Sequence, residues 1–282
     1  MTGEEGEGRV ETRDGLSLYA PSAAPVGPRA AVVLVHGLFE HCARYHHVAR
    51  YLVDRGLACQ LFDHRGHGRS PGPRVHVSTF DEFLWDVDAA VDAARRRWPA
   101  LPLFLLGHSH GALVSLLWTL RHGEALAGLA LSSPFLGVPP AARPGRLLAL
   151  AARVLSVVLP GLRLDSGVDS GGVSRDPRVV AAYRADPLIG GKLSSRWYTE
   201  ALAAFAAAQR GAALLRTPTL LMAAGRDRIA DVEATRRLAA AIPPDLLQTV
   251  WWDELYHEIF NEPEKEAVLA RLGDWLESRL AR

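Results

Sequence analysis

A serine lies at the centre of residues 107–111, whose sequence Gly-His-Ser-His-Gly has the form Gly-x-Ser-x-Gly. The apolar run 103–106 precedes it, and an apolar, helix-compatible segment follows to about His122. A strand, a sharp turn and a helix in this order predict a nucleophile elbow, which presents a serine hydroxyl above the end of a sheet. The flanking glycines permit the close approach of the strand and helix backbones. We therefore interpret Ser109 as a candidate nucleophile, although the pentapeptide alone would also fit an ordinary turn.

A serine nucleophile needs a base, and the base needs an acid that orients it and stabilises its cation. Asp227 follows the apolar run 219–224, and His257 follows the run 248–252. Because ligands of this architecture lie beyond the carboxyl ends of strands, both residues are correctly placed for these roles. His257 is also the only histidine after His122. The order Ser109, Asp227, His257 is that of an α/β-hydrolase triad.

Each of these assignments has an alternative. Asp227 would be an ordinary surface acid if it paired with a neighbouring arginine, Arg226 or Arg228, and the acid would then be Asp253 or Glu254. His257 would be an exposed loop histidine. Asp231 has a different expected role, as the cap of the next helix.

A tetrahedral intermediate also needs backbone amides that stabilise its oxyanion. One donor should be the amide of His110, which follows the nucleophile at the start of the helix. The second should come from residues 36–39, His-Gly-Leu-Phe, where a glycine lets the backbone turn close to the site. We favour the amide of Leu38 over that of Phe39.

The elements that must position these groups follow from hydrophobic periodicity. Strands are predicted at 30–35, 57–62, 103–106, 126–131, 219–224 and 248–252, and helices at 44–55, 80–98, 109–122, 231–241 and 263–280. This alternation predicts an α/β fold with a mostly parallel sheet and helices on both faces. It stops between residues 134 and 205, which contain no convincing buried strand. We therefore expect a core of residues 1–133 and 206–282, interrupted by a helical cap at 134–205.

The amino-terminal part has its own pattern. Residues 10–19 alternate around Asp14-Gly15 and predict a hairpin, whereas residues 21–29 predict a loop. Residues 1–8 are acidic and glycine-rich, unlike the start of a signal peptide, and predict a frayed tail.

Composition limits the function further. A net charge of +1 gives no general attraction to nucleic acid, so we expect no nucleic-acid partner. The two cysteines, Cys42 and Cys59, suit a reducing compartment, and we expect a cytoplasmic protein. The most apolar segment, 147–164, contains Arg153 and Pro160 and is a poor transmembrane helix. The oligomeric state is left open.

Three histidine pairs raise the question of a metal: His46 with His47, His64 with His67, and His108 with His110. No further cluster has the helical His-x-x-x-His or cysteine spacing that would complete a site. We therefore expect neither a metal nor a cofactor. His108 is also unsuited as the base, because adjacent side chains at an elbow point away from each other, and Cys42 is expected to be a small buried side chain.

Four segments carry a family resemblance. They are His-Gly-x-x-Glu-His-x-x-Arg-Tyr at 36–45, Asp-His-Arg-Gly-His-Gly-Arg-Ser at 63–70, Gly-x-Asp-x-Ile at 225–229 and His-Glu-x-x-Asn-Glu at 257–262. Together they resemble the monoacylglycerol lipase and lysophospholipase branch of the α/β-hydrolase superfamily, over about residues 30–265. One position departs from it, since the family usually has methionine where this chain has His110. The amide at that position does not depend on the side chain, but the packing around the pocket does.

The resemblance implies a serine hydrolase that cleaves carboxylic esters of monoacylglycerols or lysophospholipids. It also implies that residues 134–205 cover the active site and enclose an apolar acyl channel. Aliphatic side chains of the cap could line this channel, make transient contact with a membrane or micelle, or only pack the cap on the core: Leu147, Leu148, Leu150, Val154, Leu155, Val157, Val158 and Leu159.

Other functions use the same residues. The triad would also serve a general carboxylesterase, an acyltransferase or a peptidase, because the cap decides the acceptor and the substrate. A non-catalytic binding protein on this scaffold would usually lack a triad member or an elbow glycine, and all are present here. Epoxide and haloalkane hydrolases of this fold use an aspartate nucleophile, so Ser109 argues against them.

Overall fold

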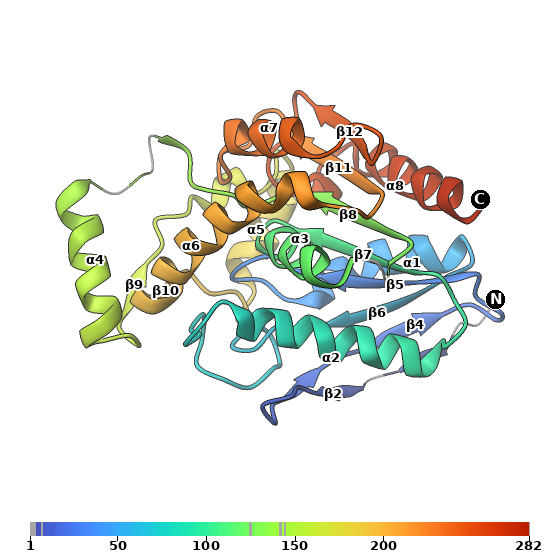
Figure 1. Ribbon diagram of the computed structural model, residues 1–282, viewed down its shortest axis with the longest axis horizontal. Helices are drawn as coiled ribbons and strands as arrows, with labels where there is room; N and C mark the ends of the chain where they lie inside the picture. The colour runs from blue at the N-terminus through green and yellow to red at the C-terminus, as the bar shows by residue number, and fades with distance from the viewer. Residues whose placement is uncertain (1–3, 7, 124–125, 141–142, 144, 282) are drawn as a thin grey trace.

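The computed structural model describes residues 4–6, 8–123, 126–140, 143 and 145–281. Its centre is a sheet in the strand order β1-β4-β6-β5-β7-β8-β11-β12 (Figure 1). The strands are β1 (Glu4–Gly6), β4 (Ser22–Ala24), β5 (Ala30–Val35), β6 (Leu57–Phe62), β7 (Leu103–His108), β8 (Gly128–Ser132), β11 (Thr219–Ala224) and β12 (Leu247–Trp252). From β6 to β12 every neighbouring pair is parallel. The predicted α/β fold with a mostly parallel sheet is therefore confirmed.

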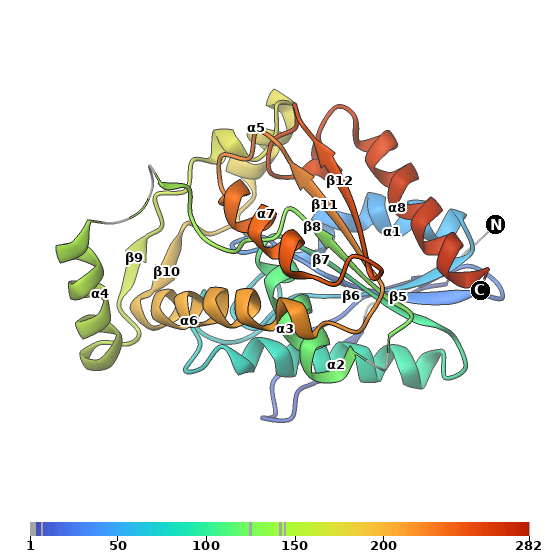
Figure 2. The same ribbon diagram turned by 45° about the horizontal axis from the view of Figure 1, so that its top comes forward.

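Helices cover both faces of this sheet (Figures 1 and 2). One face packs against α1 (His46–Asp54) and α8 (Lys265–Leu280). The other packs against α2 (Asp81–Arg97), α3 (His110–His122), α6 (Ser195–Gly211) and α7 (Val232–Ala241). Short 3₁₀ helices include Cys42–Tyr45, Ser170–Gly172, Ala212–Leu214 and Ile259–Asn261.

Strand β5 shows why the strands of this sheet have continuous apolar sequences. All six of its residues are buried. Ala30, Val32 and Leu34 belong to the core beneath α1 and α8. The intervening residues belong to the core on the opposite face. Side chains alternate between the two faces of a strand, and with both faces covered no position is left for a polar residue.

The amino-terminal part differs from its prediction in two places. Residues 4–6 form β1 and residues 22–24 form β4, where a frayed tail and a loop were expected. These strands pair with each other, and β4 also pairs antiparallel with β6, so they extend the sheet at its edge. Both strands have only three residues, which is too short for a sequence period to reveal. The hairpin is confirmed as β2 (Arg9–Glu11) and β3 (Ser17–Tyr19).

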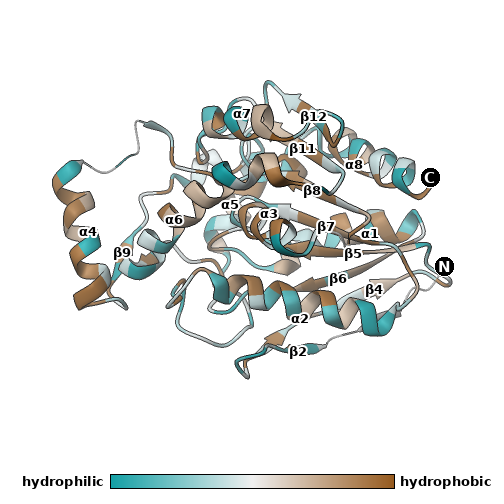
Figure 3. Cartoon of the chain, in the orientation of Figure 1, coloured by the Kyte–Doolittle hydropathy of each residue, from teal (hydrophilic) through white to brown (hydrophobic). Residues whose placement is uncertain are grey.

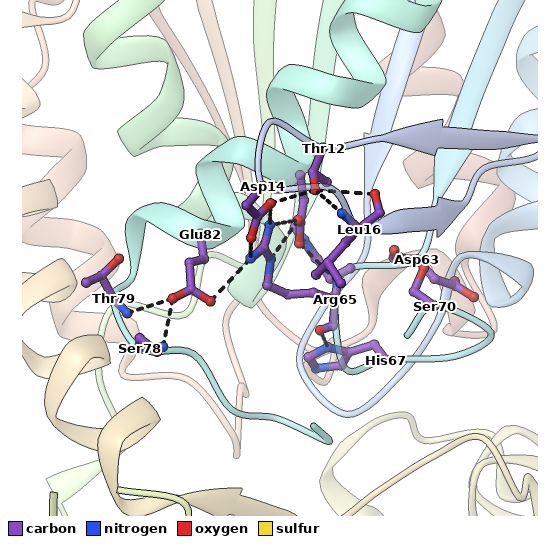
Figure 4. A network of polar contacts seen from close by, with 12 residues as sticks. Thr12, Asp14, Leu16, Asp63, Arg65, His67, Ser70, Ser78, Thr79 and Glu82 are labelled. Atoms are coloured by element: carbon purple, nitrogen blue, oxygen red, sulfur yellow. Dashed lines mark hydrogen bonds and ion pairs between the residues drawn. The ribbon is translucent and has the colours of Figure 1, made fainter. Parts of the chain in front are cut away.

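Arg65 fastens this hairpin to the core (Figure 4). Its guanidinium donates to both carboxylate oxygens of Asp14, at 2.8 and 3.1 Å, and to Glu82 at 3.2 Å. Its Nε donates to Asp86, whose side chain is fully buried. Burial raises the pKa of Asp86 to about 7, and the charge of Arg65 opposes that rise. Through Arg65, the loop that follows β6 is therefore bound both to the hairpin and to helix α2.

The insertion between β8 and β11 extends away from the sheet (Figures 1 and 2). It contains α4 (Arg146–Val158), β9 (Arg163–Asp165), α5 (Pro177–Ala185) and β10 (Lys192–Ser194). Among the described residues, the short strands β9 and β10 pair with each other and not with the main sheet. Helix α6 begins in this segment and continues beyond residue 205 to Gly211.

Helix α4 lies at the outer end of the insertion and packs on α6. Figure 3 shows that it is among the most hydrophobic parts of the chain, although it is at the periphery. None of the helices formed by the described residues has the length and hydrophobicity needed to span a membrane.

Candidate active site

The turn between β7 and α3 has the geometry of a nucleophile elbow. Ser109 adopts φ 54° and ψ −117°, a region that side-chain-bearing residues rarely occupy. A Cβ atom on Gly111 would lie 2.2 Å from the carbonyl oxygen of Val35, and one on Gly107 would lie 2.5 Å from that of Gly111. Only glycine fits at either position. The strand, turn and helix predicted around Ser109 are therefore all present.

Three side chains from distant parts of the chain meet at this turn. The Nε2 atom of His257 lies 2.7 Å from the hydroxyl of Ser109. The Nδ1 atom of the same ring lies 2.7 Å from a carboxylate oxygen of Asp227. Ser109 and His257 are only 6% and 4% exposed. The structure thus brings all three sequence-predicted residues into one chain of hydrogen bonds, and His257 is not an exposed loop residue.

Backbone amides orient the Asp227 carboxylate. Its Oδ1 atom accepts hydrogen bonds from the amides of Ile229 and Ala230, both at 2.8 Å, which leaves Oδ2 for His257. The neighbouring arginines pair elsewhere, Arg226 with Glu254 and Arg228 with Asp169. The surface-acid interpretation of Asp227 is therefore wrong.

Asp231 caps the helix that follows. Its carboxylate accepts from the amides of Glu233 and Ala234 at the start of α7, as the sequence predicted.

The electrostatic surroundings of His257 favour its charged form. Burial is the largest single effect and disfavours protonation, but the charge and hydrogen bond of Asp227, together with the charges of Glu258 and Glu40, outweigh it. The pKa of His257 is therefore raised above its usual value. A histidine hydrogen-bonded to a hydroxyl and made more basic by a carboxylate can remove the hydroxyl proton and later return it.

The segment expected to complete the oxyanion site lies against the nucleophile. A Cβ atom on Gly37 would lie 3.2 Å from the Cβ atom of Ser109. Leu38 and Ser109 line the same cavity, and His110 begins α3, so its amide is at the helix amino terminus. Phe39 adopts φ 67° and accepts a hydrogen bond at its carbonyl from Gly190. The assignment of the two donor amides remains a prediction.

A cavity of about 40 Å³ lies over Ser109. Its lining includes Leu38, Phe135, Val168, Val173, Tyr183 and Ile229, besides the polar residues of the site. This volume holds little more than one water molecule, so this cavity is too small to be the acyl channel that the family resemblance implies.

The α4 aliphatic residues do not line this cavity. Seven of the eight proposed side chains, all except Leu155, are exposed, Leu147 to 85%. They therefore neither form a channel in this arrangement nor pack the cap onto the core. Sequence hydrophobicity could not distinguish these cases, because it does not reveal which face of a helix is covered.

The side chain of His110 points away from the cavity. It is completely buried, with its ring centroid 4.7 Å from that of Phe83 and 5.7 Å from that of Trp197 on α6. Burial lowers the pKa of His110 well below its usual value. This histidine is therefore a neutral packing residue between the elbow and α6.

Members of the other histidine pairs form hydrogen bonds with protein side chains. His108 contacts the hydroxyl of Ser132 at 3.0 Å, and His64 contacts Asp86 at 3.2 Å. Within the described ranges no three histidine, cysteine or acidic side chains are arranged to hold a metal ion.

Sequence reasoning gave no role to a set of buried charges beside the triad. Glu40, Arg44 and Glu258 belong to the family motifs, but the sequence suggested no function for them. It gave no reason to single out Tyr183 of the insertion. Arg44 contacts both carboxylates, and its guanidinium lies 4.8 Å from the centre of the Tyr183 ring. Glu40 and Arg44 are only four residues apart, but Glu40 lies before the first helix, so the helical spacing rule could not predict their pairing. Contact with Glu258, 214 residues later, had no sequence signal either.

The chain matches known proteins over nearly its whole length. Residues 27–264 match the family described as "Serine aminopeptidase, S33". A monoacylglycerol lipase of Mycolicibacterium smegmatis is 37% identical over 90% of both chains. A phospholipase of Bacillus subtilis is 35% identical over 86% of this chain and 92% of its own. The crystal structure of a monoacylglycerol lipase from Paleococcus ferrophilus superposes with a TM-score of 0.85 at 30% identity, covering 93% of this chain and 99% of that one.

These matches confirm the expected fold, the family resemblance and the expectation of a serine ester hydrolase. They extend through the insertion as well as the sheet, since the family match is continuous from residue 27 to residue 264. The chain therefore belongs to the serine aminopeptidase S33 family of α/β-hydrolases and is a relative of monoacylglycerol lipases.

Proposed function

We propose that this protein hydrolyses carboxylic esters of single-chain lipids, such as monoacylglycerols and lysophospholipids, through an acyl-Ser109 intermediate. The observation that carries the proposal is the pair of 2.7 Å contacts that join Ser109, His257 and Asp227. The names of the relatives, monoacylglycerol lipase and phospholipase, support the class of substrate.

In the first half of the reaction, the hydroxyl oxygen of Ser109 attacks the ester carbonyl while His257 takes its proton. The amides of Leu38 and His110 donate hydrogen bonds to the oxyanion that forms. The intermediate collapses when the bond to the alcohol breaks, and His257 gives its proton to the leaving oxygen. Asp227 keeps the imidazole in the orientation and tautomer that these transfers need.

In the second half, water attacks the acyl-enzyme and His257 accepts the water proton. When the second tetrahedral intermediate collapses, the bond between the acyl carbon and Ser109 breaks, His257 gives its proton to the Ser109 oxygen, and the fatty acid is released. Hydrolysis therefore consumes one water molecule, produces an alcohol and a carboxylic acid, and needs no cofactor.

The insertion contributes selectivity in this proposal. Residues 134–205 act as a cap, and its segment 168–183 supplies Val168, Val173 and Tyr183 to the cavity. Because the cavity of about 40 Å³ cannot hold a long acyl chain, the cap must move before a lipid enters.

We also propose that α4 makes transient contact with a lipid surface. Its exposed side chains include Leu147, Leu150 and Val157, and they lie beside the exposed Arg146 and Arg153. Aliphatic side chains flanked by arginine suit the boundary between acyl chains and anionic head groups. A cytoplasmic location is part of the same proposal, and the free thiols of Cys42 and Cys59 are compatible with it.

A second candidate is the hydrolysis of peptides, which the description of the matching family favours. An aminopeptidase must bind a free α-ammonium group, usually with a carboxylate. The two carboxylates on the cavity, Glu40 and Glu258, are both already bound to Arg44. This arrangement supports an uncharged ester substrate over an amino-terminal peptide.

The first test uses a fluorophosphonate, which forms an oxygen–phosphorus bond to an active serine as fluoride leaves. We expect one adduct by intact mass, located at Ser109 and absent from Ser109→Ala. Labelling that persists in Ser109→Ala would contradict the assignment of the nucleophile.

The second test compares p-nitrophenyl esters and monoacylglycerols of increasing chain length, with and without micelles, against aminoacyl-p-nitroanilides. We expect hydrolysis of medium and long acyl esters. Faster turnover of the aminoacyl substrates would favour the peptidase.

A further inference from the structure

A group of buried charges lies directly beside the triad, the Arg44 network, which we define as Glu40, Arg44 and Glu258. Arg44 donates from Nη1 to Glu40 at 2.9 Å and to Glu258 at 2.6 Å, and from Nη2 to the second oxygen of Glu258 at 2.7 Å. The side chains of both glutamates are at most 5% exposed, and that of Arg44 is 11% exposed. One guanidinium therefore joins two carboxylates that lie more than 200 residues apart in the chain.

The Glu40 end of the network holds the predicted oxyanion loop. The Oε1 atom of Glu40 accepts from the amide of Gly37 at 2.6 Å and from the hydroxyl of Tyr45 at 2.5 Å. Gly37 directly precedes Leu38, whose amide is the predicted oxyanion donor. A carboxylate that binds the Gly37 amide restricts the rotation of the next peptide unit, and thus the direction of the Leu38 amide.

The Glu258 end holds the histidine loop. Glu258 directly follows His257, its amide donates to the carbonyl of Val173 at 2.9 Å, and its side chain also accepts from Asn261 at 2.9 Å. The backbone on which His257 is mounted is therefore fixed by a side chain that is itself bound to Arg44. Because Tyr183 lies on the guanidinium face, the insertion completes the enclosure of this ion group.

We propose that Arg44 and Glu258 are positioning residues, through which the oxyanion loop and the catalytic histidine are held in one fixed arrangement. This inference rests on the proposed function, since it concerns the same site. A single arginine between two site loops is a more direct means of alignment than separate ion pairs would be. The planar guanidinium binds the Glu258 carboxylate through two parallel hydrogen bonds, which specify orientation as well as distance.

The network also acts on the charge of His257. The groups around this ring are Asp227 beyond β11, His108 at the end of β7, Glu40 after β5 and Glu258 in its own loop. Arg44 is bound to both glutamates, and Tyr183 of α5 lines the same cavity. Glu258 and Glu40 favour protonated His257, after the larger effects of burial and Asp227. Loss of the Glu258 charge should therefore lower the pKa of His257 and move the acidic limb of the pH–rate profile to lower pH.

The test compares Glu258→Gln and Arg44→Lys in the full-length protein. For Glu258→Gln we expect kcat roughly tenfold to a hundredfold lower, because small misplacements of catalytic groups have effects of this size. KM should change little, and the acidic limb should move to lower pH. Arg44→Lys keeps the positive charge but loses the paired hydrogen bonds, so kcat should fall while the acidic limb stays near its wild-type position.

Glu262→Gln is the matched control. Glu262 is also buried in this part of the chain, but its carboxylate binds Arg175, and it is not one of the largest influences on the pKa of His257. We expect the control to keep the wild-type kcat and acidic limb. The proposal is overturned if Glu258→Gln keeps both within error, or if Glu262→Gln reproduces the effects of Glu258→Gln. If Glu258→Gln does not fold, Arg44→Lys decides, and an unchanged kcat contradicts the proposal.

The readout separates this proposal from the proposed function. The rate of fluorophosphonate labelling of Ser109, measured as a function of pH, reports the nucleophile and base without a lipid substrate. If the wild-type protein is labelled but cleaves no lipid ester, the substrate assignment fails. The labelling profiles of the variants then still test the roles of Arg44 and Glu258.

Discussion

The strand-end loops of the sheet bury polar side chains, whereas helix α4 of the insertion exposes apolar ones. At the strand ends, Ser109, His257 and the carboxylate of Asp227 are buried and bound to one another. On α4, every leucine and valine side chain except Leu155 is more than half exposed. Polar groups are thus removed from water where chemistry needs a fixed geometry, and apolar groups are left in water where a lipid surface could cover them.

This difference in burial determines how well each region tolerates amino-acid substitutions. A buried polar group is stable only when its hydrogen bonds are made, so the strand-end loops must keep one geometry. An exposed leucine contributes little to folding, so α4 can be selected for contact with something outside the chain. Four predictions test this contrast, from the largest expected effect to the smallest.

The strand-end region should be most sensitive at Asp227. In Asp227→Asn the imidazole loses the carboxylate that sets its tautomer and stabilises its cation, so kcat should fall by roughly 10³- to 10⁴-fold. Ester hydrolysis under saturating substrate measures the effect, with circular dichroism as a control for folding. A fully active Asp227→Asn would transfer the acid role to Asp253 or Glu254.

The same substitution in the two regions should have unequal effects on stability. Leu105 in β7 is completely buried, so Leu105→Ala should lower the free energy of unfolding by about 2–5 kcal/mol. Leu147 in α4 is 85% exposed, and Leu147→Ala should change it by less than about 0.5 kcal/mol. Urea unfolding of the two variants measures both values. Equal losses would show that α4 is packed against the protein.

Acid should destabilise the core through its buried histidines. Burial lowers the pKa of His36 to about 4 and that of His67 to about 3, against about 6.5 in an unfolded chain. The folded state thus binds fewer protons, so stability is complete above pH 6.5 and is lost as the pH falls toward 4 and then 3. The combined loss should reach several kcal/mol, on the order of 1.4 kcal/mol for each unit of pKa difference.

Urea unfolding at pH 7, 5 and 4 measures this dependence. All eleven histidines lie outside residues 134–205, although His41 contacts Asp186 and His76 contacts Ser194 of that segment. Unchanged stability down to pH 4 would show that the buried rings do not charge with unfolding.

Polar substitutions on α4 should have the smallest effect on folding, but they should clearly weaken binding to lipid vesicles. The pair Leu147→Ser and Leu150→Ser should reduce co-sedimentation with phosphatidylcholine vesicles that contain phosphatidylglycerol. Arg146 and Arg153 flank these leucines, so binding should also weaken with added salt.

Leu214→Ser is the control for this experiment, because Leu214 is a leucine outside the insertion that is 67% exposed. It should bind vesicles as the wild type does. Equal vesicle binding by all three proteins would exclude α4 as the contact surface.

The sequence by itself determined the alternation of strands and helices, the elbow at Ser109 and the order of Asp227 and His257 after their strands. These features follow from local patterns: apolar periodicity, glycine at a sharp turn, and a polar residue where a buried strand ends. The sequence also identified His110 as the departure from the family pattern, but it could not show that this side chain packs between Phe83 and Trp197.

Only the tertiary structure decided which distant groups meet. The short strand β4 pairs with β6, and β1 pairs with β4, so both depend on a strand that lies far along the chain. The bond between Arg44 and Glu258 joins loops that follow β5 and β12, and the exposure of α4 depends on which of its faces α6 covers. Local periodicity carries no information about such contacts, because burial and ion pairing depend on what the rest of the chain brings alongside.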